Sequence, residues 1–127
     1  MNRVIAPDTI APPAANYAHA VLSEAPARLL HTAGVVPTAP DGSVPDDLGA
    51  QAEVVWANVA AILEAADMGP DDVVSITTYV VAGHSLGPVM AARDRFLAGH
   101  LAASVLVAVP ELARPEWQME VAVVAAR

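Results

Sequence analysis

The stretch "AQAEVVWANVAAILEAADMGPDDVVSITTYVV", residues 50–81, contains the two patterns that decide the fold. A helical pattern runs from Asp47 to Met68, because apolar residues recur there every three or four positions and form one buried stripe. Gly69-Pro70 ends this helix. The β-branched run over residues 71–81 is typical of a central strand. The stripe consists of Leu48, Ala52, Val55, Trp56, Val59, Ile62, Leu63 and Ala66.

The segments before this stretch have shorter patterns. Residues 1–16 carry three prolines and no sustained periodicity, which predicts an extended N-terminal lead-in. Residues 17–24 and 27–37 are apolar runs separated by Pro26, as expected for a pair of strands. Residues 38–47 supply a Pro-Asp-Gly turn and an acidic pair that can cap the following helix.

A second helix and a further strand are predicted after the central strand. From residue 85 to about residue 100, apolar and charged residues alternate at helical spacing. The run "HLAASVLVAVPEL", residues 100–112, is expected to be a strand bound for the core. Alternation places three of its valines on one face: Val105, Val107 and Val109.

Residues 116–127 are expected to form the last strand. Its Gln118 and Glu120 point away from an apolar face. The order strand, strand, helix, strand, helix, strand, strand predicts an α+β domain in which both helices cover one face of the sheet. The apolar face of the last strand consists of Trp117, Met119, Val121 and Val123.

The length and apolar content of the chain describe a single domain with a tendency to associate. A chain of 127 residues suits one domain, spanning residues 1–127, with a sizeable core. Hydrophobic residues make up 55% of it and the mean hydropathy is +0.46, yet no apolar run approaches the roughly 18 residues of a membrane span. We expect no membrane partner. The apolar excess favours subunit contacts, and therefore a homo-oligomer.

The charge balance argues against nucleic acid as a partner. Fourteen acidic residues against six basic ones give a net charge of -8, which repels phosphate backbones. The opening segment has one basic residue and several prolines where a secretory signal needs a continuous apolar run. The sequence therefore predicts a cytoplasmic protein.

The residue types that are missing exclude several chemistries. The chain has no cysteine, which excludes disulfides, thiolate metal sites and a cysteine nucleophile. All six basic residues are arginines, so no lysine is present to form a Schiff base with pyridoxal phosphate or a substrate. We expect neither a metal nor a cofactor. The four histidines show no metal-ligand spacing: His19, His31, His84 and His100.

Four segments together point to a known family: "NYAHAV" near the start, "HTAGVVP" in the second run, residues 50–81, and the closing "QMEVAVVA". They resemble the RidA family, also called YjgF-type or liver perchloric-acid-soluble proteins. The resemblance extends from about Ile5 to Ala126. Four residues in this order and spacing make it fairly specific: Gly34, Gln51, Asn58 and Glu120.

The resemblance implies a fold, an assembly and a reaction. It implies chorismate-mutase-like subunits, each with a mixed sheet and two helices on one face, in a homotrimer with small-molecule clefts at the subunit interfaces. The best-known members hydrolyse reactive 2-imino or enamine acids to 2-keto acids and ammonia. An arginine on the fourth strand clamps the substrate carboxylate, and a glutamate on the last strand, here Glu120, positions or activates water.

The chain departs from this family at the clamp. The family's Pro-Ala-Arg-Ser segment reads Leu-Ala-Ala-Ser at residues 101–104, so Ala103 stands at the place of the arginine. Losing a charge-assisted bidentate contact costs roughly 2 to 4 kcal/mol of binding. Met90 replaces an asparagine, Arg93 an aromatic residue, and Ala33 a serine. These changes predict a more apolar site and argue against the usual imino-acid reaction.

The candidate site has Glu120 as its catalytic residue and eight substrate-binding residues. The segment between the second helix and the fourth strand is shorter than in the family, which brings His100 nearer the cleft mouth. Arg93 could replace the missing clamp, although its charged neighbours favour a solvated charged face. The substrate-binding candidates are Tyr17, Thr32, Gly34, Met90, Arg93, His100, Ala103 and Ser104.

Structural roles remain open for four of these residues. Glu120 could be a solvated strand carboxylate, and Tyr17 an aromatic residue packed on its neighbours. Gly34 could serve backbone geometry, which is the role we favour for it. Ser104 could bond only to the backbone.

Two functions fit these observations. The first is an enzyme with altered specificity that hydrolyses an imine, an enamine or a related small metabolite through water directed by Glu120. The alternative is a noncatalytic trimer that binds a metabolite at its subunit interface and has a regulatory role. The sequence leaves open whether the protein is an enzyme. A ribonuclease is disfavoured because the chain is acidic and lacks a basic stripe.

Overall fold

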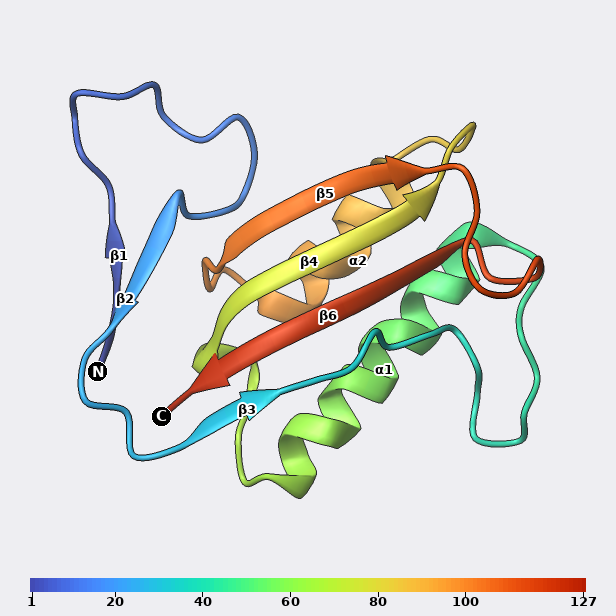
Figure 1. The fold of residues 1–127 in the computed structure, drawn as a ribbon, viewed down its shortest axis with the longest axis horizontal. Helices are drawn as coiled ribbons and strands as arrows, with labels where there is room; N and C mark the ends of the chain where they lie inside the picture. The colour runs from blue at the N-terminus through green and yellow to red at the C-terminus, as the bar shows by residue number, and fades with distance from the viewer.

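Two helices pack on one face of a four-stranded mixed sheet in the computed structural model, which describes residues 1–127 (Figure 1). The strand order is β3 (Leu29–His31), β6 (Met119–Ala126), β4 (Val73–Val81) and β5 (Ala103–Val109). β4 and β5 run parallel, whereas β6 is antiparallel to both β3 and β4. This is the predicted α+β arrangement, with both helices on the same side of the sheet.

The first helix, α1 (Leu48–Ala65), buries six of the eight residues of the predicted stripe, and the other two, Ile62 and Ala66, are half-buried and pack against the core. Asp47 caps it, because the Asp47 carboxylate accepts a hydrogen bond from the backbone N–H of Ala50 at 2.9 Å. The helix ends three residues before the predicted Met68. Asp67 takes a left-handed backbone conformation with φ of 53°, and the chain turns back there before the short 3₁₀ helix η1 (Pro70–Asp72) and β4.

The second helix, α2 (Gly87–Leu97), is also shorter than predicted. Pro88 lies in its first turn, where the missing N–H has no intrahelical partner to lose. Ala98 and Gly99 have φ of 48° and 94°, and these left-handed residues end the helix before residue 100. Neither α1 nor α2 is long and apolar enough to cross a membrane.

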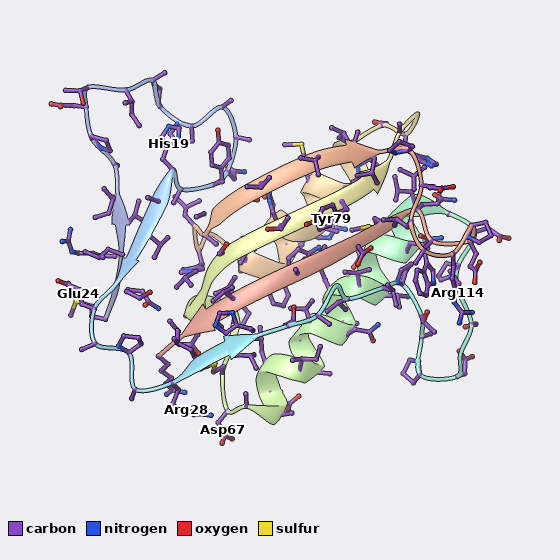
Figure 2. The ribbon with its side chains drawn as sticks, viewed as in Figure 1. His19, Glu24, Arg28, Asp67, Tyr79 and Arg114 are labelled. Carbon is purple, nitrogen blue, oxygen red and sulfur yellow. The ribbon has the colours of Figure 1, made fainter.

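The helices cover only one face of the sheet. Val80, Met119 and Val121 point toward the helices and are fully buried. On the other face, which we call the open face, Val105 is 54% exposed and Val107 is 38% exposed. The prediction of a strand bound for the core is therefore wrong for these valines, because alternation groups residues on a face but does not tell which face the helices cover. Tyr79 lies between Val107 and Glu120 in the strand register and is drawn on the uncovered side of β4 (Figure 2).

The N-terminal segment contains a strand that the sequence patterns missed. β1 (Asn2–Ile5) pairs antiparallel with β2 (Ala20–Ser23) and forms a separate two-stranded ribbon beside the sheet (Figure 1). The two strands expected within residues 17–24 and 27–37 are present as β2 and β3, but they do not pair with each other, since β2 pairs with β1 and β3 pairs with β6. Short strands choose partners by tertiary contacts: the Asn2 side chain, for example, donates to the carbonyl oxygen of Ala126 at 2.7 Å.

The predicted Pro-Asp-Gly turn is present before α1. Gly42 has φ of 87°, which favours glycine. The pKa of the Asp41 carboxyl is lowered, first by a hydrogen bond from the Ser43 hydroxyl at 2.6 Å and then by one from the Ser43 backbone N–H at 3.0 Å. Both contacts stabilise the charged carboxylate and hold the turn.

Candidate functional site

Seven of the nine predicted site residues fall into two groups on opposite sides of the four-stranded sheet. The first, which we call the Arg93 group, lies where α2 faces β5 and the segment before β2. It consists of Tyr17, Met90, Arg93 and Ser104, which together with Ala15, Leu86 and Leu106 line a pocket of about 300 Å³. Apart from Arg93 and the hydroxyl groups, the pocket wall is apolar.

Backbone contacts to β5 position Tyr17. The N–H of Ala18 donates to the carbonyl oxygen of Ala102 at 2.9 Å, and Ala18 forms a parallel bridge with Ala103. The Tyr17 hydroxyl accepts a hydrogen bond from the Ala14 N–H at 3.3 Å. Its ring meets His19 edge-on, with 5.8 Å between the ring centroids. The segment before β2 therefore forms one wall of the pocket and carries Tyr17.

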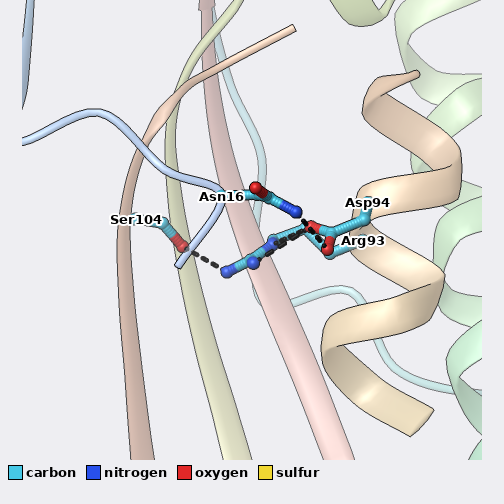
Figure 3. Close-up of polar contacts among 4 residues, drawn as sticks. All are labelled: Asn16, Arg93, Asp94 and Ser104. Atoms are coloured by element: carbon cyan, nitrogen blue, oxygen red, sulfur yellow. Dashed lines mark hydrogen bonds and ion pairs between the residues drawn. The ribbon is translucent and has the colours of Figure 1, made fainter. Parts of the chain in front are cut away.

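Arg93 is buried, with 5% of its surface exposed, so the expectation of a solvated charged face is wrong for this residue. Its Nε and Nη2 donate to Asp94 Oδ1 at 3.1 and 3.0 Å, and its Nη1 lies 3.5 Å from Ser104 Oγ (Figure 3). Asn16 Nδ2 donates to the other oxygen of Asp94 at 3.0 Å. Arg95, in contrast, is exposed and pairs with Glu53 of α1.

The second group, which we call the Glu120 group, consists of Thr32, Gly34 and Glu120 on the β3–β6 side of the sheet. Antiparallel pairing continues past β3, where the N–H of Thr32 donates to the Val123 carbonyl oxygen at 3.0 Å. The Thr32 hydroxyl accepts from the Val123 N–H at 2.9 Å and donates to the Ala33 carbonyl oxygen at 2.7 Å. Backbone groups thus occupy the donor and one acceptor position of the Thr32 hydroxyl.

Gly34 lies directly against the carboxylate of Glu120. A Cβ atom added to Gly34 would stand 1.9 Å from Glu120 Oε2, so only glycine leaves room for the carboxylate in this position. The φ of Gly34 is not in the left-handed region, which shows that contact with Glu120, and not unusual backbone geometry, requires a glycine here. The role in backbone geometry that we favoured for Gly34 from the sequence is therefore wrong.

A groove of about 630 Å³ adjoins the Glu120 group between α1 and the segment after β3. Thr32 and Gly34 line it together with Asn58 and apolar residues. The Asn58 side-chain amide donates to the carbonyl oxygens of Val36 and Thr38 at 3.2 and 3.0 Å. Asn58 therefore holds the segment that carries Gly34 against α1.

Ala103 and His100 line neither the pocket of the Arg93 group nor the groove beside the Glu120 group. Ala103 is on the open face with Glu120, but the two residues are four register positions and two interstrand spacings apart, a distance of about 16 Å at ordinary strand dimensions. Nε2 of His100 is 2.7 Å from the Val73 carbonyl oxygen. His100 lines a hollow of about 210 Å³ together with Asn16 and Asp94. This hollow lies next to the Arg93 group, because Asp94 pairs with Arg93.

Sequence reasoning missed the residues that hold Arg93 in place. Asn16 is 78 positions from Asp94 in the chain, and no spacing pattern connects them. Asp94 stood in the sequence only as one member of a charged run. No cluster of three or more His, Cys, Asp or Glu side chains that could hold a metal ion occurs in the structure.

Replacing Gly34 by alanine is expected to push the Glu120 carboxylate aside by more than about 1 Å, because contact at 1.9 Å is far inside van der Waals distance. The free energy of unfolding is expected to change by less than about 1 kcal/mol, since the end of a flexible side chain can move away. A crystal structure of the variant and equilibrium unfolding in urea measure the two effects. Gly69→Ala is the matched control, because its new Cβ would meet no atom within 4 Å. An unmoved carboxylate in Gly34→Ala would contradict this account of the glycine.

Comparisons with known proteins agree with the fold. The family model described as endoribonuclease L-PSP matches residues 8–127. The 2-iminobutanoate/2-iminopropanoate deaminase of Escherichia coli strain K12 is 32% identical over 103 residues, which cover 79% of this chain and 80% of that protein.

Two solved structures extend the likeness over almost the whole chain. YyfB of Yersinia pestis, described as a protein of unknown function of the conserved Rid protein family, has a TM-score of 0.85 and 34% identity, with 99% of this chain and 98% of that chain covered. The YjgF gene product of E. coli has a TM-score of 0.73 and 28% identity, with 98% of each chain covered. Together with the family match over residues 8–127, these relatives show that the chain belongs to the endoribonuclease L-PSP family, the Rid or YjgF-type family that its sequence resembles.

Proposed function

We propose that the protein is a deaminase-like hydrolase that acts on a small imine or enamine at a cleft between subunits of a homotrimer. Glu120 directs the attacking water, and the Arg93 group binds the substrate. The observation that carries the proposal is the half-buried carboxylate of Glu120, which lies where only a glycine at residue 34 leaves room for it, in a chain related to an imine deaminase.

The separation of the two groups supports a site shared between subunits. Within one chain the central strand β4 lies between β5, which carries Ser104, and β6, which carries Glu120. A small substrate cannot span both groups in one subunit. The open face supplies the contact surface that an assembly needs, because it exposes Tyr79, Val105 and Val107. An adjoining copy would bring its Glu120 group to the Arg93 group of its neighbour.

The chemistry needs one group that accepts and returns a proton. Water adds to the carbon of the protonated C=N bond while Glu120 takes a proton from the water, and the product is a neutral carbinolamine. Glu120 then returns this proton to the nitrogen. As the C–N bond breaks, the hydroxyl group gives its proton to Glu120, which passes it to the departing ammonia, so a carbonyl compound and ammonium leave. An enamine enters the same sequence after solvent protonates its carbon to give the iminium ion.

The experiment that tests this function measures ammonia release, or trapping of the remaining imine by semicarbazide, when the protein meets imino acids generated in place by an amino-acid oxidase. The wild type is compared with Ala103→Arg. Acceleration by Ala103→Arg but not by the wild type is the expected result for an intact scaffold whose natural substrate lacks a carboxylate. Acceleration by the wild type would show that another group binds the carboxylate of an imino acid.

The second candidate function is a noncatalytic trimer that binds and reports on a metabolite. Ala103 favours it, because a small apolar side chain stands where the related enzymes have an arginine. It predicts saturable binding of a small molecule without product. Inactivity of both the wild type and Ala103→Arg, combined with such binding, would establish this function in place of the hydrolase.

A further inference from the structure

The charge of Arg93 is already balanced inside the fold. Asp94 accepts two hydrogen bonds from the guanidinium through one oxygen, and Asn16 holds its other oxygen. The pair is built from adjacent residues of α2 and fixed by the segment before β2, so it is part of the folded chain and needs no ligand to form. The pocket of the Arg93 group therefore has an arginine in its wall but no net positive charge.

The guanidinium still has donors to offer. Of its five N–H groups, two point to Asp94 and one faces Ser104 at 3.5 Å, a long contact. The remaining two belong to the Nη atoms of a side chain that lines the pocket. The rest of the lining includes Leu86 and Leu106, which cannot accept these hydrogen bonds, and Met90, whose thioether sulfur accepts only weakly.

We propose that this pocket selects a neutral carbonyl or amide oxygen on an apolar ligand over a carboxylate. This selectivity names the class of substrate for the proposed function. It rests on that function for the reaction, whereas the binding preference itself does not depend on it. A carboxylate on the Nη edge would lie near the carboxylate of Asp94, so repulsion cancels much of its attraction to Arg93 while its hydration is lost. A neutral oxygen keeps a charge-assisted hydrogen bond without that loss.

Two further observations favour a neutral ligand. The chain has a net charge of -8, which lowers the concentration of anions near every surface. β5 carries no basic residue, so no second guanidinium from this strand offsets the charge of Asp94.

The test compares two probes with the same carbon skeleton, 2-oxobutanamide and 2-oxobutanoate, titrated into the full-length protein by isothermal calorimetry or protein NMR. The wild type is expected to bind the amide at least tenfold more tightly than the acid. Asp94→Asn keeps an oxygen that accepts from Arg93 but removes the negative charge. It is expected to raise the affinity for the acid at least tenfold and to change the affinity for the amide less than threefold.

The matched control is Glu53→Gln, which removes one negative charge from an exposed pair with Arg95 and leaves the pocket untouched. The ratio of its affinity for the amide to its affinity for the acid is expected to equal that of the wild type. Equal or tighter binding of the acid by the wild type, failure of both probes to bind, or an unchanged ratio in Asp94→Asn overturns the proposal. Binding is measured without turnover, so a protein that prefers the amide but hydrolyses no imine contradicts only the proposed function.

Discussion

Replacing Glu120 by glutamine is expected to lower the rate of imine hydrolysis at least 100-fold. Glutamine has nearly the same shape as glutamate but cannot accept a proton from water, and general base catalysis contributes roughly 10²- to 10⁴-fold. The measurement is ammonia release at saturating imine, on the substrate that the wild type turns over fastest. The elution volume on size exclusion shows whether the assembly is intact.

The control for this prediction is Glu64→Gln, an identical change at an exposed position of α1. It is expected to leave turnover unchanged. The double variant Gly34→Ala with Glu120→Gln adds a second check, because both changes act through one carboxylate. The double variant is expected to lose no more activity than Glu120→Gln alone, so the effects of the two changes on the rate are strongly non-additive. Unchanged turnover in Glu120→Gln removes Glu120 from the mechanism.

Local sequence patterns were sufficient to predict the helices and strands in which apolar or β-branched residues recur regularly over a long stretch. The stripe from Leu48 to Ala66 predicted α1, and the β-branched run predicted β4, because helix and strand periods differ enough to be told apart over ten or more residues. The ends were less predictable. Left-handed residues such as Ala98 and Asp67 end the helices, and neither alanine nor aspartate signals that conformation as glycine does.

Features that depend on distant contacts could not be read from the sequence. The partner of β2 is β1, a four-residue strand without a recognisable pattern. The exposure of Val105 follows from the side on which the helices pack, which no property of β5 encodes. The same holds for the candidate site. Its residue types came from a family resemblance, whereas the pairing of Arg93 with Asp94, whose other oxygen accepts from the distant Asn16, is visible only in the structure.

Gln51→Ala is expected to lower the free energy of unfolding by about 3 to 5 kcal/mol, since it leaves buried backbone groups without partners and opens a cavity. Gln51 is fully buried in α1. Its amide nitrogen donates to the carbonyl oxygens of Pro45 and Glu116 at 2.7 and 2.8 Å, and its oxygen accepts from the Gln118 N–H at 2.9 Å. One side chain thus joins the segment before α1 to the segment before β6.

Equilibrium unfolding in urea at a fixed protein concentration measures this loss, and Gln118→Ala is the control. The Gln118 side chain makes one exposed hydrogen bond, to the Asp46 carbonyl oxygen at 3.0 Å, so its removal is expected to cost less than about 1 kcal/mol. A loss below about 1 kcal/mol for Gln51→Ala would mean that water replaces the amide in the core. Because Gln118 leads directly into β6, loosening this junction also releases the strand that carries Glu120, so Gln51→Ala should lower turnover at temperatures where the protein is still folded.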